Sequence, residues 1–99
     1  MKFYERHRKD LLKSIQEHGI SKDDFSFVKR RGRIITQRIQ SKNTFSYIQK
    51  SETTIDEKTK EWIDITFFEL IINDSYPQKI KDWNAIMSHF ENWLQSNHL

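Results

Sequence analysis

The carboxyl-terminal stretch 77–97 constrains the fold of this chain most, because it carries a broad apolar stripe at helical spacing. The apolar residues of the stripe are Ile80, Trp83, Ile86, Met87, Phe90, Trp93 and Leu94. Their intervals of three and four residues place all of them on one side of an α-helix. Such a helix has to bury that side against another layer, which the rest of the chain must supply.

Two capping residues compete to begin this helix, and the sequence leaves both open. Ser75 would form a capping box with Gln78 if the helix began early, whereas Asp82 stands directly before Trp83. Because Ile80 extends the apolar stripe, the pattern favours the earlier start.

Residues 3–18 predict a second amphipathic helix at the other end of the chain. Its apolar side is formed by Phe3, Tyr4, His7, Leu11, Leu12 and Ile15. Gly19 follows and can take the left-handed conformation that ends many helices. Ile20 would then pack on Ile15, which is the hydrophobic contact of a Schellman motif.

The middle of the chain is rich in β-branched and aromatic residues, which is typical of strands. We predict strands over 25–29, 33–40, 44–50 and 61–72. Three-residue loops at 30–32 and 41–43 would pair Phe27 with Ile35 and Ile39 with Phe45. A polar turn at 56–59 would join the last two strands.

This register assigns the side chains of the first three strands to two faces. One face would carry Phe25, Phe27, Ile35, Ile39, Phe45 and Tyr47. The other would carry Ser26, Val28, Arg30, Ile34, Thr36, Arg38, Ser46, Ile48 and Lys50. We therefore predict a single two-layer α+β domain over residues 1–99, with an antiparallel four-stranded meander in the order α-β-β-β-β-α. Both helices would pack on the aromatic face and leave the other face open.

The amino-acid composition indicates the cellular compartment in which we expect the protein. The chain has no cysteine, which excludes disulfides and thiolate metal sites and favours a reducing environment. The amino-terminal segment lacks the apolar run of a signal peptide, and the longest apolar run, 63–72, is too short to span a bilayer. We expect a cytoplasmic protein that does not associate with membranes.

The candidate site residues gather on and beside the predicted hairpins. The basic members are Arg30, Arg31, Arg33, Arg38 and Lys50, and the apolar members are Val28, Ile34 and Ile48. Such a surface could neutralise nucleic-acid phosphates or contact a protein. It could also be a solvated surface whose charges protect strand edges from aggregation, which is the more common role of such residues.

No catalytic constellation is present in the sequence. His7, His18, His89 and His98 lack metal-ligand spacing, and the chain's two glycines cannot build a phosphate-binding loop. A hydrolase built on Asp56, Glu57, Asp64 and Glu69 would need these carboxylates to converge. We expect no enzyme activity, no metal and no small-molecule cofactor.

Two hypotheses of function remain. The first is a small non-catalytic binding or regulatory module that acts through protein–protein contacts, including self-association. The alternative is a nucleic-acid-binding protein that uses the basic hairpin face. The tryptophans Trp62, Trp83 and Trp93 fit a small aromatic core, although tryptophan is also enriched at interface hot spots.

Overall fold

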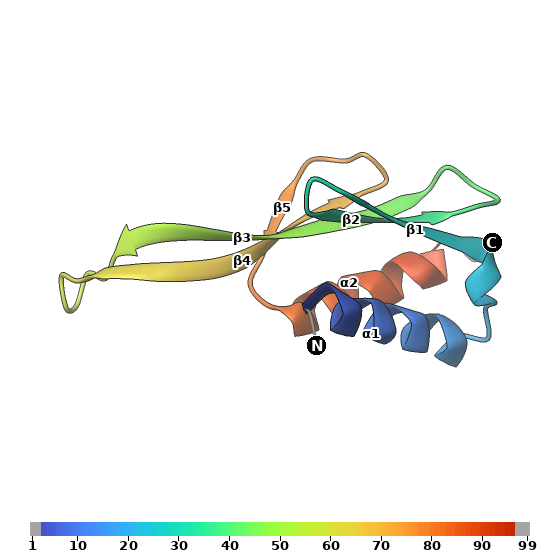
Figure 1. Ribbon diagram of the computed structural model, residues 1–99, viewed down its shortest axis with the longest axis horizontal. Coiled ribbons are helices and arrows are strands. Elements are labelled where there is room, and N and C mark those ends of the chain that lie inside the picture. The colour runs from blue at the N-terminus through green and yellow to red at the C-terminus, as the bar shows by residue number, and fades with distance from the viewer. Residues whose placement is uncertain (1–2, 97–99) are drawn as a thin grey trace.

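The computed structural model describes residues 3–96, with two helices on one face of a five-stranded antiparallel sheet (Figure 1). The elements are α1 (Phe3–Glu17), the 3-10 helix η1 (Lys22–Asp24), β1 (Phe25–Arg30), β2 (Arg33–Arg38), β3 (Thr44–Ile55), β4 (Trp62–Ile72), β5 (Gln78–Ile80) and α2 (Trp83–Ser96). The spatial order of the strands follows the sequence. The predicted α+β meander with a helix at each end is thus confirmed. Asn97 and His98 lie outside the described residues, and the side chains of residues 3–5 are not described either.

The fifth strand corrects the predicted start of the last helix. The helix begins at Trp83, and the Asp82 carboxylate accepts a hydrogen bond from the Ala85 amide at 2.9 Å. Gln78–Ile80 instead pairs with β4 as a short edge strand. The earlier start was wrong because a buried Ile80 satisfies the pattern of either element: its side chain joins the core from the sheet. The four-strand count was therefore one strand short.

The turn between β1 and β2 has two central residues, not three. Arg30 stands opposite Arg33, and Arg31 and Gly32 have φ angles of +50° and +84°. Positive φ at both positions is the mark of a type I′ turn, whose twist matches that of the flanking strands. The predicted three-residue loop is wrong.

In this register the two faces of β2 are exchanged relative to our prediction. Ile34 and Thr36 lie opposite Tyr47 and Phe45 on the helix side, and Ile35 lies on the open side. The second loop is also longer than predicted and spans 39–43. The pairing of β1 with β2 and the pairing of β2 with β3 each differ from our prediction by an odd number of residues. The two differences cancel for β3, so Phe45 and Tyr47 face the helices as expected.

The core lies between the helices and the sheet. Leu11 and Ile15 of α1, Phe45 of β3, and Ile86 and Phe90 of α2 are fully buried. Phe45 and Phe90 pack edge to face with ring centroids 5.0 Å apart.

The end of α1 is the predicted Schellman motif. The Gly19 amide donates to the Gln16 carbonyl at 2.9 Å, and the Ile20 amide donates to the Ile15 carbonyl at 3.2 Å. Gly19 has a φ of +71°, and the side chains of Ile15 and Ile20 are both buried.

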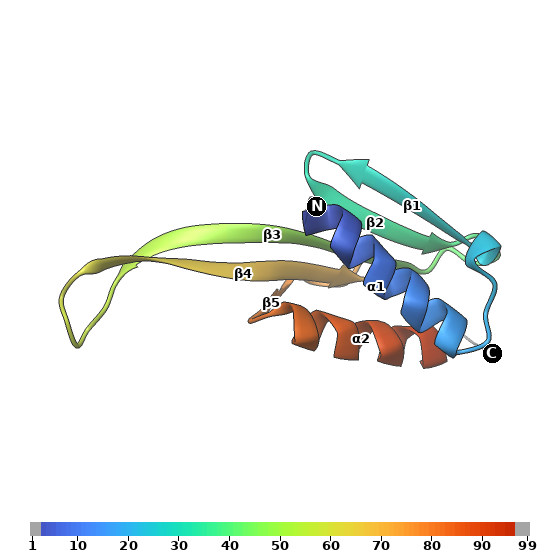
Figure 2. The same cartoon turned by 60° about the horizontal axis from the view of Figure 1, so that its bottom comes forward.

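Strands β3 and β4 continue far beyond the other elements as a two-stranded ribbon (Figures 1 and 2). We call residues 51–66 the arm; it is paired from Ser51 opposite Thr66 to Ile55 opposite Trp62. The longest dimension of the molecule is 50 Å, and its radius of gyration is 15.2 Å. A compact domain of 100 residues has a radius of gyration of about 13 Å. The arm thus lies outside the compact body, and neither helix reaches it.

Candidate binding surface on the open sheet face and the arm

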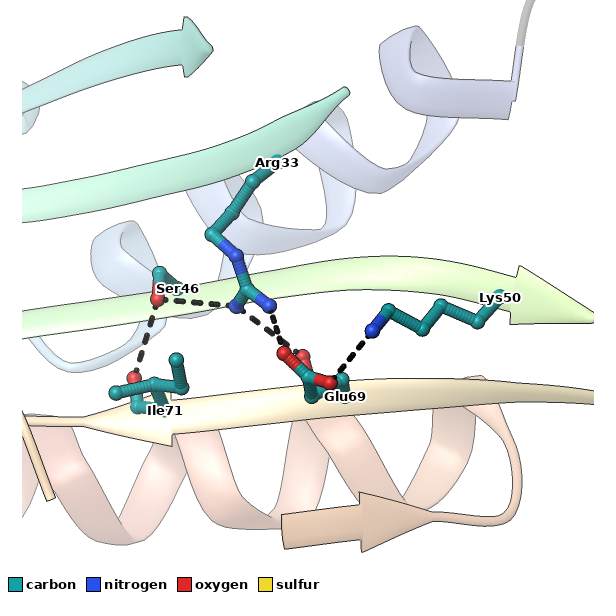
Figure 3. Close-up of polar contacts among 5 residues, drawn as sticks. All are labelled: Arg33, Ser46, Lys50, Glu69 and Ile71. Carbon is teal, nitrogen blue, oxygen red and sulfur yellow. Dashed lines mark hydrogen bonds and ion pairs between the residues drawn. The ribbon is translucent and has the colours of Figure 1, made fainter. Parts of the chain in front are cut away.

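An ion-pair cluster occupies the middle of the open sheet face (Figure 3). Arg33 of β2 reaches across β3, and its Nη2 pairs with Oε1 of Glu69 in β4. Nη1 of Arg33 also donates to the Ser46 hydroxyl and to the Glu69 carbonyl, each at 3.4 Å. The other carboxylate oxygen of Glu69 accepts from Lys50 Nζ at 2.7 Å. One acid therefore links two cations from different strands.

The electrostatics of Glu69 follow from this geometry. The hydrogen bond from Lys50, together with the charges of Lys50 and Arg33, holds the pKa of Glu69 below its ordinary value. The carboxylate is ionised at neutral pH and offsets part of the positive charge of its two partners. Arg33 and Lys50 are thus engaged within the chain.

The other predicted basic residues separate onto different surfaces. Arg38 belongs to the helix side of β2, and its guanidinium lies over the Phe25 ring at 5.6 Å. Arg30 and Arg31 are exposed at the end of the β1–β2 hairpin. The prediction that Arg38 shares the open face with Arg30 and Lys50 is therefore wrong.

The predicted apolar members separate as well. Val28 and Ile48 lie on the open side, where Val28 is exposed and Ile48 is half-buried. Ile34 packs against the core on the helix side. The reason is the one-residue slip in β2, which exchanges its two faces.

The arm exposes apolar side chains that the sequence reasoning did not assign to a site. The exposed fraction is 47% for Ile55, 70% for Trp62, 38% for Ile63 and 37% for Ile65. The register places Ile55 and Trp62 on the helix side of the ribbon and both other isoleucines on its open side. Trp93 is buried and Trp83 half-buried, so the expectation that all three tryptophans fill the core is wrong for Trp62.

Local hydrogen bonds order the tip of the arm. The Asp56 carboxylate accepts from the Lys58 amide at 2.8 Å, and the Lys60 amide donates to the Asp56 carbonyl at 2.7 Å. Lys60 has a φ of +61°, as a tight hairpin loop requires. Thr53 donates across the ribbon to Asp64 at 2.9 Å. The predicted turn at 56–59 is present.

Charge is distributed unevenly between the arm and the rest of the chain. Residues 51–66 contain five acids and two lysines, a net charge of −3. Because the whole chain has a formal net charge of +3, the remainder carries +6. The acidic arm is joined to a basic body.

The carboxylates proposed for hydrolysis do not converge. Asp56 and Glu57 lie at the arm tip, Asp64 faces the helix side, and Glu69 faces the open side. Among the side chains that the structure describes, no group of three or more His, Asp or Glu residues is placed to hold a metal ion.

His7 belongs to a buried aromatic cluster beside the root of the arm. Its ring stacks on Trp83 with centroids 3.7 Å apart and also contacts Tyr47 and Phe68. Trp83 donates from Nε1 to Asp10 at 2.8 Å. Burial lowers the pKa of His7, against the opposing effect of the Asp10 charge, and burial raises the pKa of Tyr47.

No family model, curated protein or solved structure matches this chain. Among residues 3–96, no helix is both long enough and apolar enough to cross a lipid bilayer. By its architecture the molecule is a two-layer α+β protein from which a β-ribbon projects.

Proposed function

We propose that this chain is a small, non-catalytic binding module that acts through protein–protein contacts made by the arm and the adjoining open sheet face. The observation that carries the proposal is the exposure of Ile55, Trp62, Ile63 and Ile65 on a ribbon that projects beyond the other described elements (Figures 1 and 2). Exposed apolar surface of this kind marks interaction sites, and tryptophan is the residue most often found at interface hot spots.

The strand edges of the arm add a second kind of binding capacity. β2 pairs with β3 only as far as Tyr47, and β5 pairs with β4 only from Phe68 onward. Both strands of the arm therefore present backbone amides and carbonyls along a free edge. Another strand can add to such an edge through main-chain hydrogen bonds.

Free-energy magnitudes indicate that stable binding needs both the exposed apolar side chains and the free strand edges of the arm. Burying the remaining exposed area of a half-exposed isoleucine contributes about 1 kcal/mol. Four such side chains supply several kcal/mol, whereas association costs about 4–15 kcal/mol in lost translational and rotational freedom. Apolar contact alone does not support a stable complex here, so edge hydrogen bonds and charge pairs have to contribute.

A photo-crosslinking experiment in native lysate tests this function. Trp62 is replaced by a benzophenone amino acid in the full chain, and Glu91, exposed on α2, is replaced in a matched control. We expect a protein adduct from position 62 that is absent from position 91 and unaffected by nuclease treatment. Equal labelling at both positions, or an adduct that nuclease removes, would contradict the proposal.

Nucleic-acid binding is the second candidate, and the exposure of Arg30 and Arg31 on a body of net charge +6 favours it. If these two arginines are the phosphate contacts, the log–log salt slope of binding is shallow, about −2. A variant carrying R30E and R31E should then lose binding. Binding by the double variant that matches the parent would remove this candidate.

A further inference from the structure

We propose that the arm binds a second copy of this chain, whose β3 adds antiparallel to the free edge of β3 around a two-fold axis. This inference rests on the proposed function and names its partner. The two arms would form one four-stranded ribbon between two bodies.

The position of β2 determines where the second copy lies. β2 is antiparallel to β3 and ends its pairing at Ile34 opposite Tyr47, so Arg33 stands at the position opposite Ile48. Beyond this point no strand within residues 3–96 pairs with this edge of β3 as far as Ile55. A second β3 running antiparallel enters this line from the far end, with its tip directed at the β1–β2 turn. Figure 2 shows that turn beside the root of the arm.

Charge complementarity favours this arrangement. The arm has a net charge of −3, and its tip contains Asp56, Glu57 and Glu61 beside Lys58 and Lys60, whereas the β1–β2 turn exposes Arg30 and Arg31. The two-fold axis brings each tip to the other copy's turn, so the attraction occurs twice. A parallel arrangement would instead place the two acidic arms tip to tip.

The alternation of side chains between the two faces restricts the register, because directly opposed residues of an antiparallel pair point to the same face. A two-fold axis perpendicular to the sheet therefore has to pass midway between a residue and the same residue of the second copy. An axis at Glu52 would oppose two carboxylates directly, which is destabilising. An axis at Ser51 would bring Thr54 of the second copy to the position opposite Ile48, which Arg33 occupies.

An axis at Thr53 avoids both conflicts. It pairs residues 51–55 of the two copies and places Lys50 opposite Asp56 of the second copy. Ile55 of the second copy then lies on the helix side, opposite Ser51. A cavity of about 220 Å³, lined in part by Gly32, Ile34 and Gln49, opens beside the start of β2. In this register the incoming tip would lie beside the cavity.

The free edge of β4 is a weaker acceptor. Lys79 of the neighbouring strand β5 already pairs with Glu52 at 2.7 Å, and its ammonium group lies over the Phe67 ring at 4.4 Å. The cation beside that edge is therefore engaged within the chain, whereas Arg30 and Arg31 are exposed beside the edge of β3.

A single cysteine tests both the partner and the register, because the natural chain has none. The purified full-length T53C variant is oxidised, with T66C on the opposite edge of the arm as the matched control. We expect a covalent dimer to form at least about tenfold faster from T53C, because directly opposed Cβ atoms lie within reach of a disulfide. Cross-linking of T53C no faster than that of T66C would overturn the proposed register.

Sedimentation velocity on the chain without substitutions supplies the second readout. We expect a dimer that dissociates on dilution and whose affinity falls at least about tenfold in a variant carrying R30E and R31E. Combining these changes with E57K and E61K should restore the dimer, because the contacts of residues 57 and 61 with the turn are then reversed in sign.

Failure of this inference is distinguishable from failure of the proposed function. If the chain stays monomeric while position 62 captures a different protein, the second copy is not the partner, but the proposed binding function is still supported. A monomer that captures nothing overturns both.

Discussion

The guanidinium of Arg33 in β2 and the carboxylate of Glu69 in β4 form an ion pair across the intervening strand β3. Lys50 completes the cluster from β3 itself. Three neighbouring strands are thereby joined where the arm leaves the sheet. The same contact engages two cations that the sequence assigned to a partner.

Replacing Glu69 by glutamine should lower the free energy of unfolding by about 1 kcal/mol at neutral pH, because partly exposed charge networks contribute little more. The folded-state pKa of Glu69 is lowered, so its contribution is complete above the ordinary pKa and is lost as the pH falls through the lowered value. Urea denaturation at about pH 7 and about pH 3 measures this difference. A gap between the natural chain and E69Q that widens in acid would contradict the assignment.

His7 should make the protein less stable in mild acid. Its folded-state pKa is lowered by burial, so the unfolded chain binds a proton more readily. The stabilising contribution of the neutral ring is present above the ordinary pKa of about 6.5 and declines as the pH falls through the lowered value. We expect an NMR titration to give a pKa for His7 below the ordinary histidine value of about 6.5. A pKa for His7 at or above that value would contradict the burial of its ring.

The β1–β2 turn should respond in opposite ways to two substitutions. Arg31 has a φ of +50°, so Arg31→Asn should raise the free energy of unfolding by about 0.5–1 kcal/mol, since asparagine tolerates this conformation better. Gly32→Ala should lower it by about 1–2 kcal/mol. The cause is the φ of +84° and not crowding, because an added Cβ would lie 3.6 Å from the nearest atom, on Ile48. Urea denaturation tests both changes, and equal stability of the two variants would refute the type I′ turn.

Substitutions in the arm and in the core should separate binding from folding. Phe45→Ala removes a fully buried ring and should cost about 3–5 kcal/mol of stability. Trp62 is 70% exposed, so Trp62→Ala should cost less than about 1 kcal/mol under conditions where the chain is monomeric. Thermal denaturation at low protein concentration compares them. A loss for Trp62→Ala as large as that for Phe45→Ala would show that the ring belongs to the folded core.

The sequence predicted the elements whose signals are local. Gly19 and Ile20 mark the end of α1 through backbone geometry and one apolar contact, and Asp82 offers the observed cap of α2. The alternating β-branched residues of 61–72 predicted β4, where the structure has Trp62–Ile72.

The failures concern features that depend on distant parts of the chain. The sequence Arg31-Gly32 fits a two-residue or a three-residue loop, and the choice decides which face Ile34 and Arg38 occupy. Ile80 fits a helix stripe as well as an edge strand. The exposure of Trp62 depends on where the helices end relative to β3 and β4, which no local pattern encodes. The candidate site was therefore predicted less well than the fold.

Amide hydrogen exchange along β3 tests most directly whether the arm is a pairing surface. The chain is compared at high and low protein concentration, and the amides of residues 51–55 that point to the free edge are followed by NMR. The account predicts slow exchange at high concentration that becomes fast on dilution, while core amides such as that of Phe45 stay protected at both. Fast exchange of the edge amides at every concentration, in the presence of a folded core, would contradict it.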